Sequence, residues 1–148
     1  MPRPKKLTGI IPDGSVYANA AIIFPARTAE LLEFEKHIYN PENVVELHDM
    51  RIAAKRLRYT LEIFGPFYTE SFPEFLTTFK ALQDHLGFMH DADILVPELA
   101  AAMKDKISLR GKRQLDVGVH LWDFDGAAGI LSICRKKRDE REARYVQF

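Results

Sequence analysis

Apolar and charged residues recur at helical spacing most clearly between His48 and Glu62. Because an α-helix turns by about 100° per residue, side chains three or four positions apart share one face. One apolar stripe of this segment comprises Leu47, Met50, Ala54, Leu57, Leu61 and Phe64. A second apolar edge comprises Ile52, Tyr59 and Ile63. The stripe between these two edges is charged and comprises His48, Arg51, Lys55, Arg58 and Glu62.

We call the four cations of this stripe the basic row: His48, Arg51, Lys55 and Arg58. The row is predicted to border the core rather than to lie opposite it. The face predicted to point into solvent is a different one, Glu46, Asp49, Ala53, Arg56 and Thr60. An unpaired charge at a packed boundary is costly, so the row needs a partner. That partner is either a protein carboxylate or a bound anion.

The residues before this segment predict an irregular arm and two short helices. Residues 1–14 are rich in proline and glycine and form the arm. Ser15 is placed to cap a helix through Phe24, which Pro25 then kinks or restarts. The apolar spacing of residues 28–39 predicts a separate amphipathic helix.

Capping residues set the predicted limits of the helix that carries the basic row. Asn40 acts as its N-cap, and Pro41 takes the first helical position. Gly65, followed by Pro66, ends it. The basic row is therefore predicted to lie within a single long helix.

Two more helices are predicted in the middle of the chain, so that the characteristic helices together span 41–106. Ser71 caps the first of them. Its stripe of large apolar residues is assigned to the core: Phe72, Phe75, Leu76, Phe79, Leu82 and Leu86. Gly87 either breaks this helix or marks a close contact between helices, and His90 starts the next helix, which reaches about Lys106.

The end of the chain carries one clear helix after an ambiguous stretch. Residues 108–125 contain glycines and fit either a short helix or an extended segment. Residues 127–146 are helical and carry a dense basic run that begins at Arg135. The run is either a solvated face paired with nearby acids or, at Arg135 and Arg138, the rim of an anion site. The patterns together predict an all-α antiparallel bundle of four or more helices, folded as one domain over residues 1–148.

Charge and cysteine content narrow the class of protein. The 148 residues carry 21 Lys and Arg against 21 Asp and Glu, so any affinity for anions must come from local clustering rather than net charge. A single cysteine, Cys134, excludes an intrachain disulfide and is expected to behave as a small buried apolar residue. No apolar run reaches the roughly 18 residues of a membrane helix. These features predict a cytoplasmic protein.

Two linked motifs resemble those of the CHAD family, the conserved histidine α-helical domain. The first motif is His48-Asp49-x-Arg51-x-x-x-Lys55-Arg56-x-Arg58-Tyr59-x-x-Glu62. The second is Leu82-Gln83-Asp84-x-Leu86-Gly87-x-x-His90-Asp91-x-Asp93. The resemblance implies an all-helical domain that binds inorganic polyphosphate through a basic surface. This chain departs from the family in having one copy of the motif where two similar halves are usual, and His90-Asp91 where Arg-Asp is frequent.

The resemblance implies a set of polyphosphate-binding residues and no catalytic ones. The expected binding residues are His48, Arg51, Lys55, Arg56, Arg58, Tyr59 and Lys80, with Arg135 and Arg138 of the later basic run, outside the two motifs, as outliers. Arginine offers a planar fork of donors for two phosphate oxygens, and lysine offers a compact charge. The bland alternative is that the row is neutralised inside the protein by Glu62, Asp84 and Asp91. Because there is only one motif copy, two chains are expected to combine as a homodimer to complete the surface.

Three other functions remain open at this point. A metal site would use His48, His90 and Asp91, with His85 as a further ligand, although Arg51 beside His48 opposes a cation. A phosphotransfer site would use His48 as phosphoacceptor. Nucleic acid is disfavoured because the aromatic residues are assigned to the core and leave few bases a stacking surface. No cofactor is expected.

Overall fold

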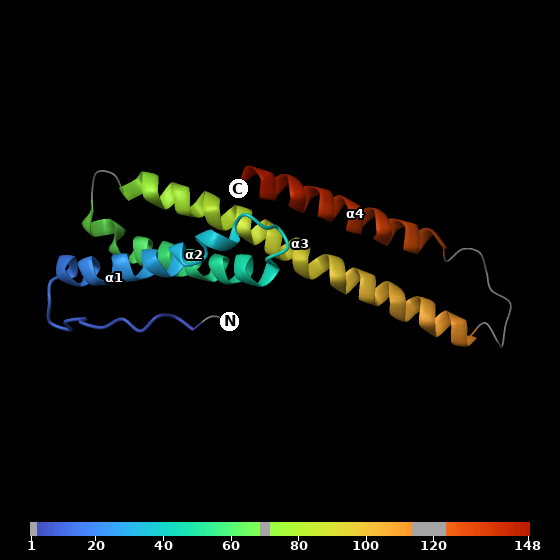
Figure 1. Ribbon diagram of the computed structural model, residues 1–148, viewed down its shortest axis with the longest axis horizontal. Helices are drawn as coiled ribbons and strands as arrows, with labels where there is room; N and C mark the ends of the chain where they lie inside the picture. Colours follow the sequence, from blue (N-terminus) through green and yellow to red (C-terminus); the bar gives the residue numbers. More distant parts are fainter. Residues whose placement is uncertain (1–2, 69–71, 114–123) are drawn as a thin grey trace. The chain divides into compact units, whose positions relative to one another are not determined.

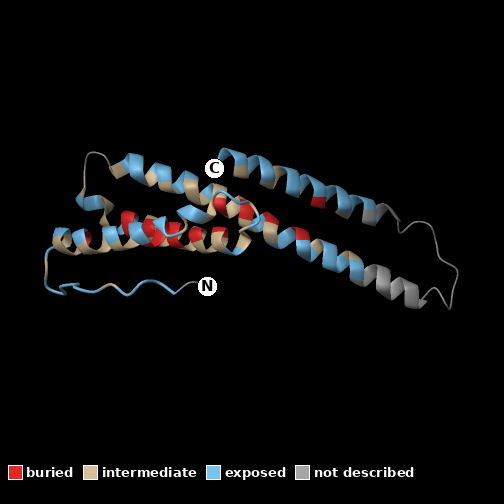
Figure 2. Ribbon diagram, in the orientation of Figure 1, coloured by how far each residue is buried: buried red, intermediate tan, exposed pale blue. Residues whose placement is uncertain are grey.

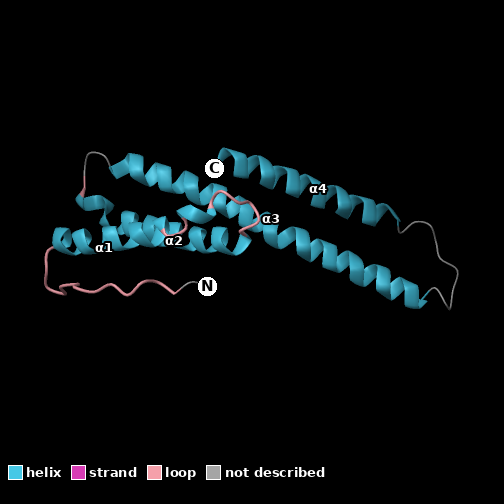
Figure 3. Cartoon of the chain, viewed as in Figure 1, coloured by secondary structure: helices cyan, strands magenta, loops and turns pink. Residues whose placement is uncertain are grey.

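The computed structural model describes residues 3–68, 72–113 and 124–148, with the side chains of 105–113, 124, 125 and 127 left undescribed. Its α-helices are α1 (Val16–Leu32), α2 (Val44–Phe64), α3 (Phe72–Arg113) and α4 (Phe124–Gln147), as Figure 1 shows. Short 3-10 helices occur at Glu35–His37 and Gly65–Phe67. No strand occurs in these described ranges (Figure 3), so the predicted all-α class is confirmed.

The chain divides into two compact units. The first comprises Met1–Gly87 with Phe148, and the second comprises Phe88–Gln147. Helix α3 contributes to both units, while α1 and α2 belong to the first and α4 to the second. The single domain expected over residues 1–148 stays a prediction. Among the described helices, none is long and apolar enough to cross a membrane.

Helix α1 begins where the sequence predicts and ends where it does not. The Ser15 side-chain oxygen accepts a hydrogen bond from the backbone N–H of Ala18 at 3.1 Å, which confirms the predicted cap. The helix then passes through Pro25 without ending, so the expected separate helix over residues 28–39 is wrong. A proline inside a helix costs about 3 kcal/mol. Packing beside it opposes that cost, because the Phe24 ring lies 5.5 Å from the ring of Phe64.

Helix α2 starts three residues later than predicted. Asn43 is its N-cap, and the Asn40 side chain instead accepts a hydrogen bond from the backbone N–H of Glu42 at 3.0 Å. Asparagine forms such local turns readily, so Pro41 lies in a turn before the helix rather than at its first position. The predicted end at Gly65 is confirmed.

A group of aromatic rings packs at this end of the first unit. It comprises Tyr17, Phe24, Phe64, Tyr68 and Phe72. A side chain at Gly65 would enter this group, because a Cβ there would lie 2.9 Å from the Phe72 ring. Glycine at this position is therefore required by close packing, since its backbone has ordinary right-handed helical angles.

Helix α3 is continuous from Phe72 to Arg113, so Gly87 does not break it and no separate helix starts at His90. Gly87 instead marks a contact between helices, the other alternative expected from the sequence, because a Cβ there would lie 3.7 Å from the Arg51 Nε of α2. Glycine lowers helix stability by about 1 kcal/mol relative to alanine, which the burial of Leu86 and Met89 on either side can offset. Of the core stripe predicted here, Leu86 is buried, but Phe75 is exposed and that assignment is wrong. The predicted cap Ser71 and residues 114–123 lie outside the described residues. The predicted last helix is confirmed as α4.

The faces of α2 differ from those predicted (Figure 2). Ala53 and Thr60, assigned to solvent, are 1% and 9% exposed. Tyr59 and Ile63, assigned to an apolar edge, are exposed. The reason is α1, which packs against α2 and pairs through Glu30 with Arg56 on the face that also holds Ala53 and Thr60. A helical wheel drawn on one helix cannot show which face its neighbour takes.

Candidate anion-binding site

The basic row lies along α2, and each of its four side chains is half-buried. On α3, Gln83 and Gly87 lie beside it, which follows from the contacts of Arg58 and Arg51 described below. At 1.5 Å rise per residue, Arg51, Lys55 and Arg58 are spaced about 6 Å and 4.5 Å apart along the axis. The row therefore offers a positive charge about once per helical turn. His48, at its start, also has a polar or ring contact within the protein.

Arg58 is held by three neighbours. Its Nε donates to the Gln83 side-chain oxygen at 2.6 Å, and its Nη1 donates to Glu62 at 2.6 Å. The guanidinium carbon lies 4.7 Å from the centre of the Tyr59 ring. No described residue bonds to its Nη2, so that side of the fork can still accept a ligand oxygen. The arginine is thus fixed in place with donors to spare.

Arg51 has a different environment. Its Nε is buried and has no hydrogen-bond partner among the described residues. A Cβ built at Gly87 would lie 3.7 Å from that Nε, so α3 passes close to the Arg51 side chain. A buried donor without an acceptor costs roughly 1–3 kcal/mol. An anion bound beside Arg51 would supply the acceptor that the protein does not.

Lys55 is the remaining cation of the row, and the Tyr59 ring lies beside it. The Lys55 ammonium lies 5.6 Å from the centre of the Tyr59 ring, so this half-exposed ring contacts two cations, Lys55 and Arg58. Cation–π contact orients both side chains without neutralising either. The tyrosine is therefore placed as a positioning residue for the row.

The row keeps a net positive charge. Of the three carboxylates expected to neutralise the row, Glu62 does so within the first unit, where it pairs with Arg58. Asp84 and Asp91 are both exposed, and neither makes an ion pair with any residue the structure describes. Arg51, Lys55 and Arg58 are thus opposed by one carboxylate among the described residues, which leaves two uncompensated positive charges.

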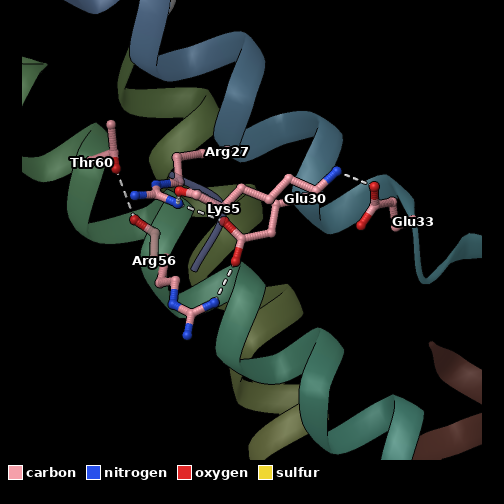
Figure 4. Close-up of polar contacts among 6 residues, drawn as sticks. All are labelled: Lys5, Arg27, Glu30, Glu33, Arg56 and Thr60. Carbon is pink, nitrogen blue, oxygen red and sulfur yellow. Dashed lines mark hydrogen bonds and ion pairs between the residues drawn. The ribbon is translucent and has the colours of Figure 1, made fainter. Parts of the chain in front are cut away.

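Arg56 has a partner that the sequence did not suggest (Figure 4). Its guanidinium pairs with Glu30 of α1, which is 5% exposed, and Glu30 also pairs with Arg27 at 2.7 Å. Thr60 donates to the Arg56 backbone carbonyl at 2.9 Å. Arg56 therefore turns toward α1, and its charge is shared with a buried carboxylate. An exposed pair lies nearby between Lys5 of the N-terminal arm and Glu33, the C-cap of α1.

The remaining expected site residues lie on other helices. Lys80 is exposed on α3, three residues before Gln83 and so on the same side of the helix. Arg135 and Arg138 lie on α4 in the second unit and are described with it below. The first unit therefore brings together His48, Arg51, Lys55, Arg58 and Tyr59, with Arg56 turned aside.

The arrangement of a basic row on one helix beside a Gln-Asp motif on the next is accompanied by a match to a known family. The model of the CHAD domain matches residues 12–100. The chain belongs to the CHAD family. The match covers α1, α2 and the first part of α3, and α4 lies outside it. No curated protein and no solved structure matches the chain.

CHAD domains are known, in general terms, to bind inorganic polyphosphate. In this CHAD domain the two motifs come together through Arg58 with Gln83 and Arg51 with Gly87. Among the described residues, no group of three or more His, Cys, Asp or Glu side chains could hold a metal ion. The Nδ1 atom of His85 is buried and finds no hydrogen-bond partner in the part of the chain described.

Replacing Gly87 with alanine tests the continuous helix beside the CHAD motif. The change is expected to raise the free energy of unfolding by about 0.5–1 kcal/mol, the helix propensity difference between the two residues. The new methyl group meets only the Arg51 side chain, at ordinary contact distance. Urea denaturation measures the effect.

Gly65→Ala is the matched control, because its Cβ would press against the Phe72 ring and should lower stability. If Gly87→Ala destabilises the protein as much as Gly65→Ala, then α3 is not an ordinary helix at Gly87.

Proposed function

We propose that this CHAD domain binds inorganic polyphosphate along the basic row of α2 and does not transform it. The observation that carries the proposal is the Arg51 Nε, a buried cationic donor without an acceptor among the described residues. Buried donors in proteins almost always have a partner, which is the protein itself, an ordered water or a bound ion. Lys55, which has no ion-pair partner among the described residues, and Arg58, whose Nη2 is open, lie on the same side of the helix and extend the row.

The chemistry of polyphosphate suits this row. The polymer presents a repeating series of anionic oxygens, and the row presents a donor about once per turn. Arg51 and Arg58 offer planar forks that can hold two oxygens each, whereas Lys55 offers a single charge. Because Gln83 and Glu62 already fix Arg58, its side chain would lose little conformational entropy on binding. The contacts would all be to phosphate oxygens, so no step of bond cleavage is included.

A calorimetric titration at two salt concentrations tests the proposal. Long-chain polyphosphate is expected to bind, and the affinity is expected to fall roughly 10- to 20-fold when salt rises from about 50 to about 200 mM. By analogy with single-stranded nucleic acid, each of three contacted charges contributes about 0.7 to the slope of log affinity against log salt concentration. Binding that is absent at low salt, or that does not respond to salt, would contradict it.

Two chains are further proposed to combine on one polymer, because this chain has one copy of the family motif. Light scattering would then show a dimer in the presence of polyphosphate. A complex that contains one chain at every polymer length would rule this out.

A further inference from the structure

The second unit uses most of the cations of α4 internally. Arg141 donates to Asp93 of α3 through Nε at 2.5 Å and through Nη2 at 3.3 Å. Lys137 and Arg144 lie over the ring of Phe88, at 5.1 Å and 5.3 Å from its centre. These contacts hold α4 antiparallel against the second part of α3.

Two lysines of α4 also form ion pairs within the helix. Lys136 and Lys137 both pair with Glu140, at 3.9 Å and 2.8 Å. The hydrogen bond from Lys137 lowers the pKa of the Glu140 carboxyl, and the charges of Lys136 and Arg144 act in the same direction. The pairing of basic residues with nearby acids that was predicted for α4 thus occurs at Lys136, Lys137 and Glu140.

Arg135 and Arg138 are different, since neither makes an ion pair with any side chain that the structure describes. Both line a cleft of about 480 Å³ between α3 and α4. Across the cleft on α3 lies Lys104, which likewise has no ion-pair partner among the described side chains. Asp139 is the one carboxylate of the lining, so the rim carries two net positive charges.

The floor of the cleft is apolar. It consists of Ala100, Met103, Leu131 and Cys134. Cys134 is buried, as expected from the sequence, and acts here as a small apolar residue. Leu131 is 56% exposed, so the floor includes apolar surface that a ligand could cover. The volume lies within the roughly 300–1,000 Å³ of small-molecule sites.

We infer that this cleft binds an amphiphilic anion, a free fatty acid in its carboxylate form. Three cations without described partners favour an anionic head group, and Lys104 and the two arginines can reach it from both helices. The apolar floor favours an unbranched hydrocarbon tail, because burying apolar surface is favourable. A strongly hydrated polyphosphate chain would gain nothing from such a floor. The cleft is therefore a site separate in chemistry from the basic row of α2.

Decanoate, used below its critical micelle concentration, is the probe, and calorimetry on the full chain is the measurement. Decanoate is expected to bind more tightly than decanol, which has the same tail and no charge. The double change Arg135→Gln with Arg138→Gln should weaken decanoate binding by roughly tenfold or more, the effect of losing hydrogen bonds to a charged group.

Lys136→Gln is the matched control, because Lys136 lies on the same helix, is exposed and does not line the cleft. It should leave decanoate affinity unchanged, and so should Arg51→Met, which separates failure here from failure of the polyphosphate site. Circular dichroism checks that each variant is folded. The inference is overturned if decanoate does not bind, if Lys136→Gln weakens binding equally, or if polyphosphate displaces decanoate. Binding to anionic lipid vesicles without binding of monomeric decanoate would also overturn it.

Discussion

Replacing Arg51 with methionine is expected to weaken polyphosphate binding by roughly 10- to 150-fold without lowering the free energy of unfolding. Methionine keeps an unbranched apolar stem beside Gly87, so packing against α3 is retained. The change removes a buried Nε donor that has no partner among the described residues, so it removes a cost from the folded protein. A residue kept for stability would give the opposite result.

The measurements are calorimetry for affinity and urea denaturation for stability. Lys36→Met is the matched control, because Lys36 is exposed in the 3-10 helix Glu35–His37 and loses the same charge. It should change affinity little. Arg51→Lys should fall between the two, since it keeps the charge and loses the fork. Loss of stability in Arg51→Met, with affinity unchanged, would make Arg51 a structural residue.

Replacing Glu30 with alanine is expected to lower the free energy of unfolding by about 3 kcal/mol, the low end for breaking a buried ion pair. Glu30 is nearly inaccessible and joins Arg27 to Arg56, so its loss leaves two guanidinium groups without their carboxylate at the packed boundary of α1 and α2. The loss in free energy of unfolding falls at the low end because the side chains of Arg27 and Arg56 keep 14% and 22% exposure and are partly hydrated.

Urea denaturation measures this effect, and Glu33→Ala, at the C-cap of the same helix, provides the control. Glu33 pairs with Lys5 at an exposed position, where a salt bridge contributes about 0–1 kcal/mol. Combining Glu30→Leu with Arg56→Met should recover much of the loss, because the pair is then replaced by apolar packing. Equal effects of Glu30→Ala and Glu33→Ala would show that the Glu30 pair is not structural.

The helices of this chain could be predicted where the signal is local. Ser15 marks the start of α1, Gly65 marks the end of α2, and apolar spacing marks α4. The errors occur where packing outweighs a local preference. Pro25 and Gly87 both disfavour a helix interior, yet α1 and α3 pass through them. Beside Pro25 the Phe24 ring packs against Phe64, and on either side of Gly87 the side chains of Leu86 and Met89 are buried.

The site could be predicted in part for a related reason. The basic row follows from the spacing of Arg51, Lys55 and Arg58 on one helix. The position of Arg56 does not, because its partner Glu30 lies 26 residues away on another helix. A wheel assigns Arg56 to solvent, whereas α1 covers that face. The ion pair with Glu30 of α1 therefore sets the direction of Arg56, and spacing within α2 could not show it.

The NMR signal of the Arg51 Nε–H tests the central claim most directly. Arginine labelled with ¹⁵N would be observed with and without polyphosphate, and Arg51→Met would assign the signal. We expect the Arg51 signal to shift and its hydrogen exchange to slow when the polymer is added, because the donor gains an acceptor. The Arg58 Nε–H, already bonded to Gln83, should change less. An Arg51 signal that stays unchanged at saturating polyphosphate would contradict binding at the basic row.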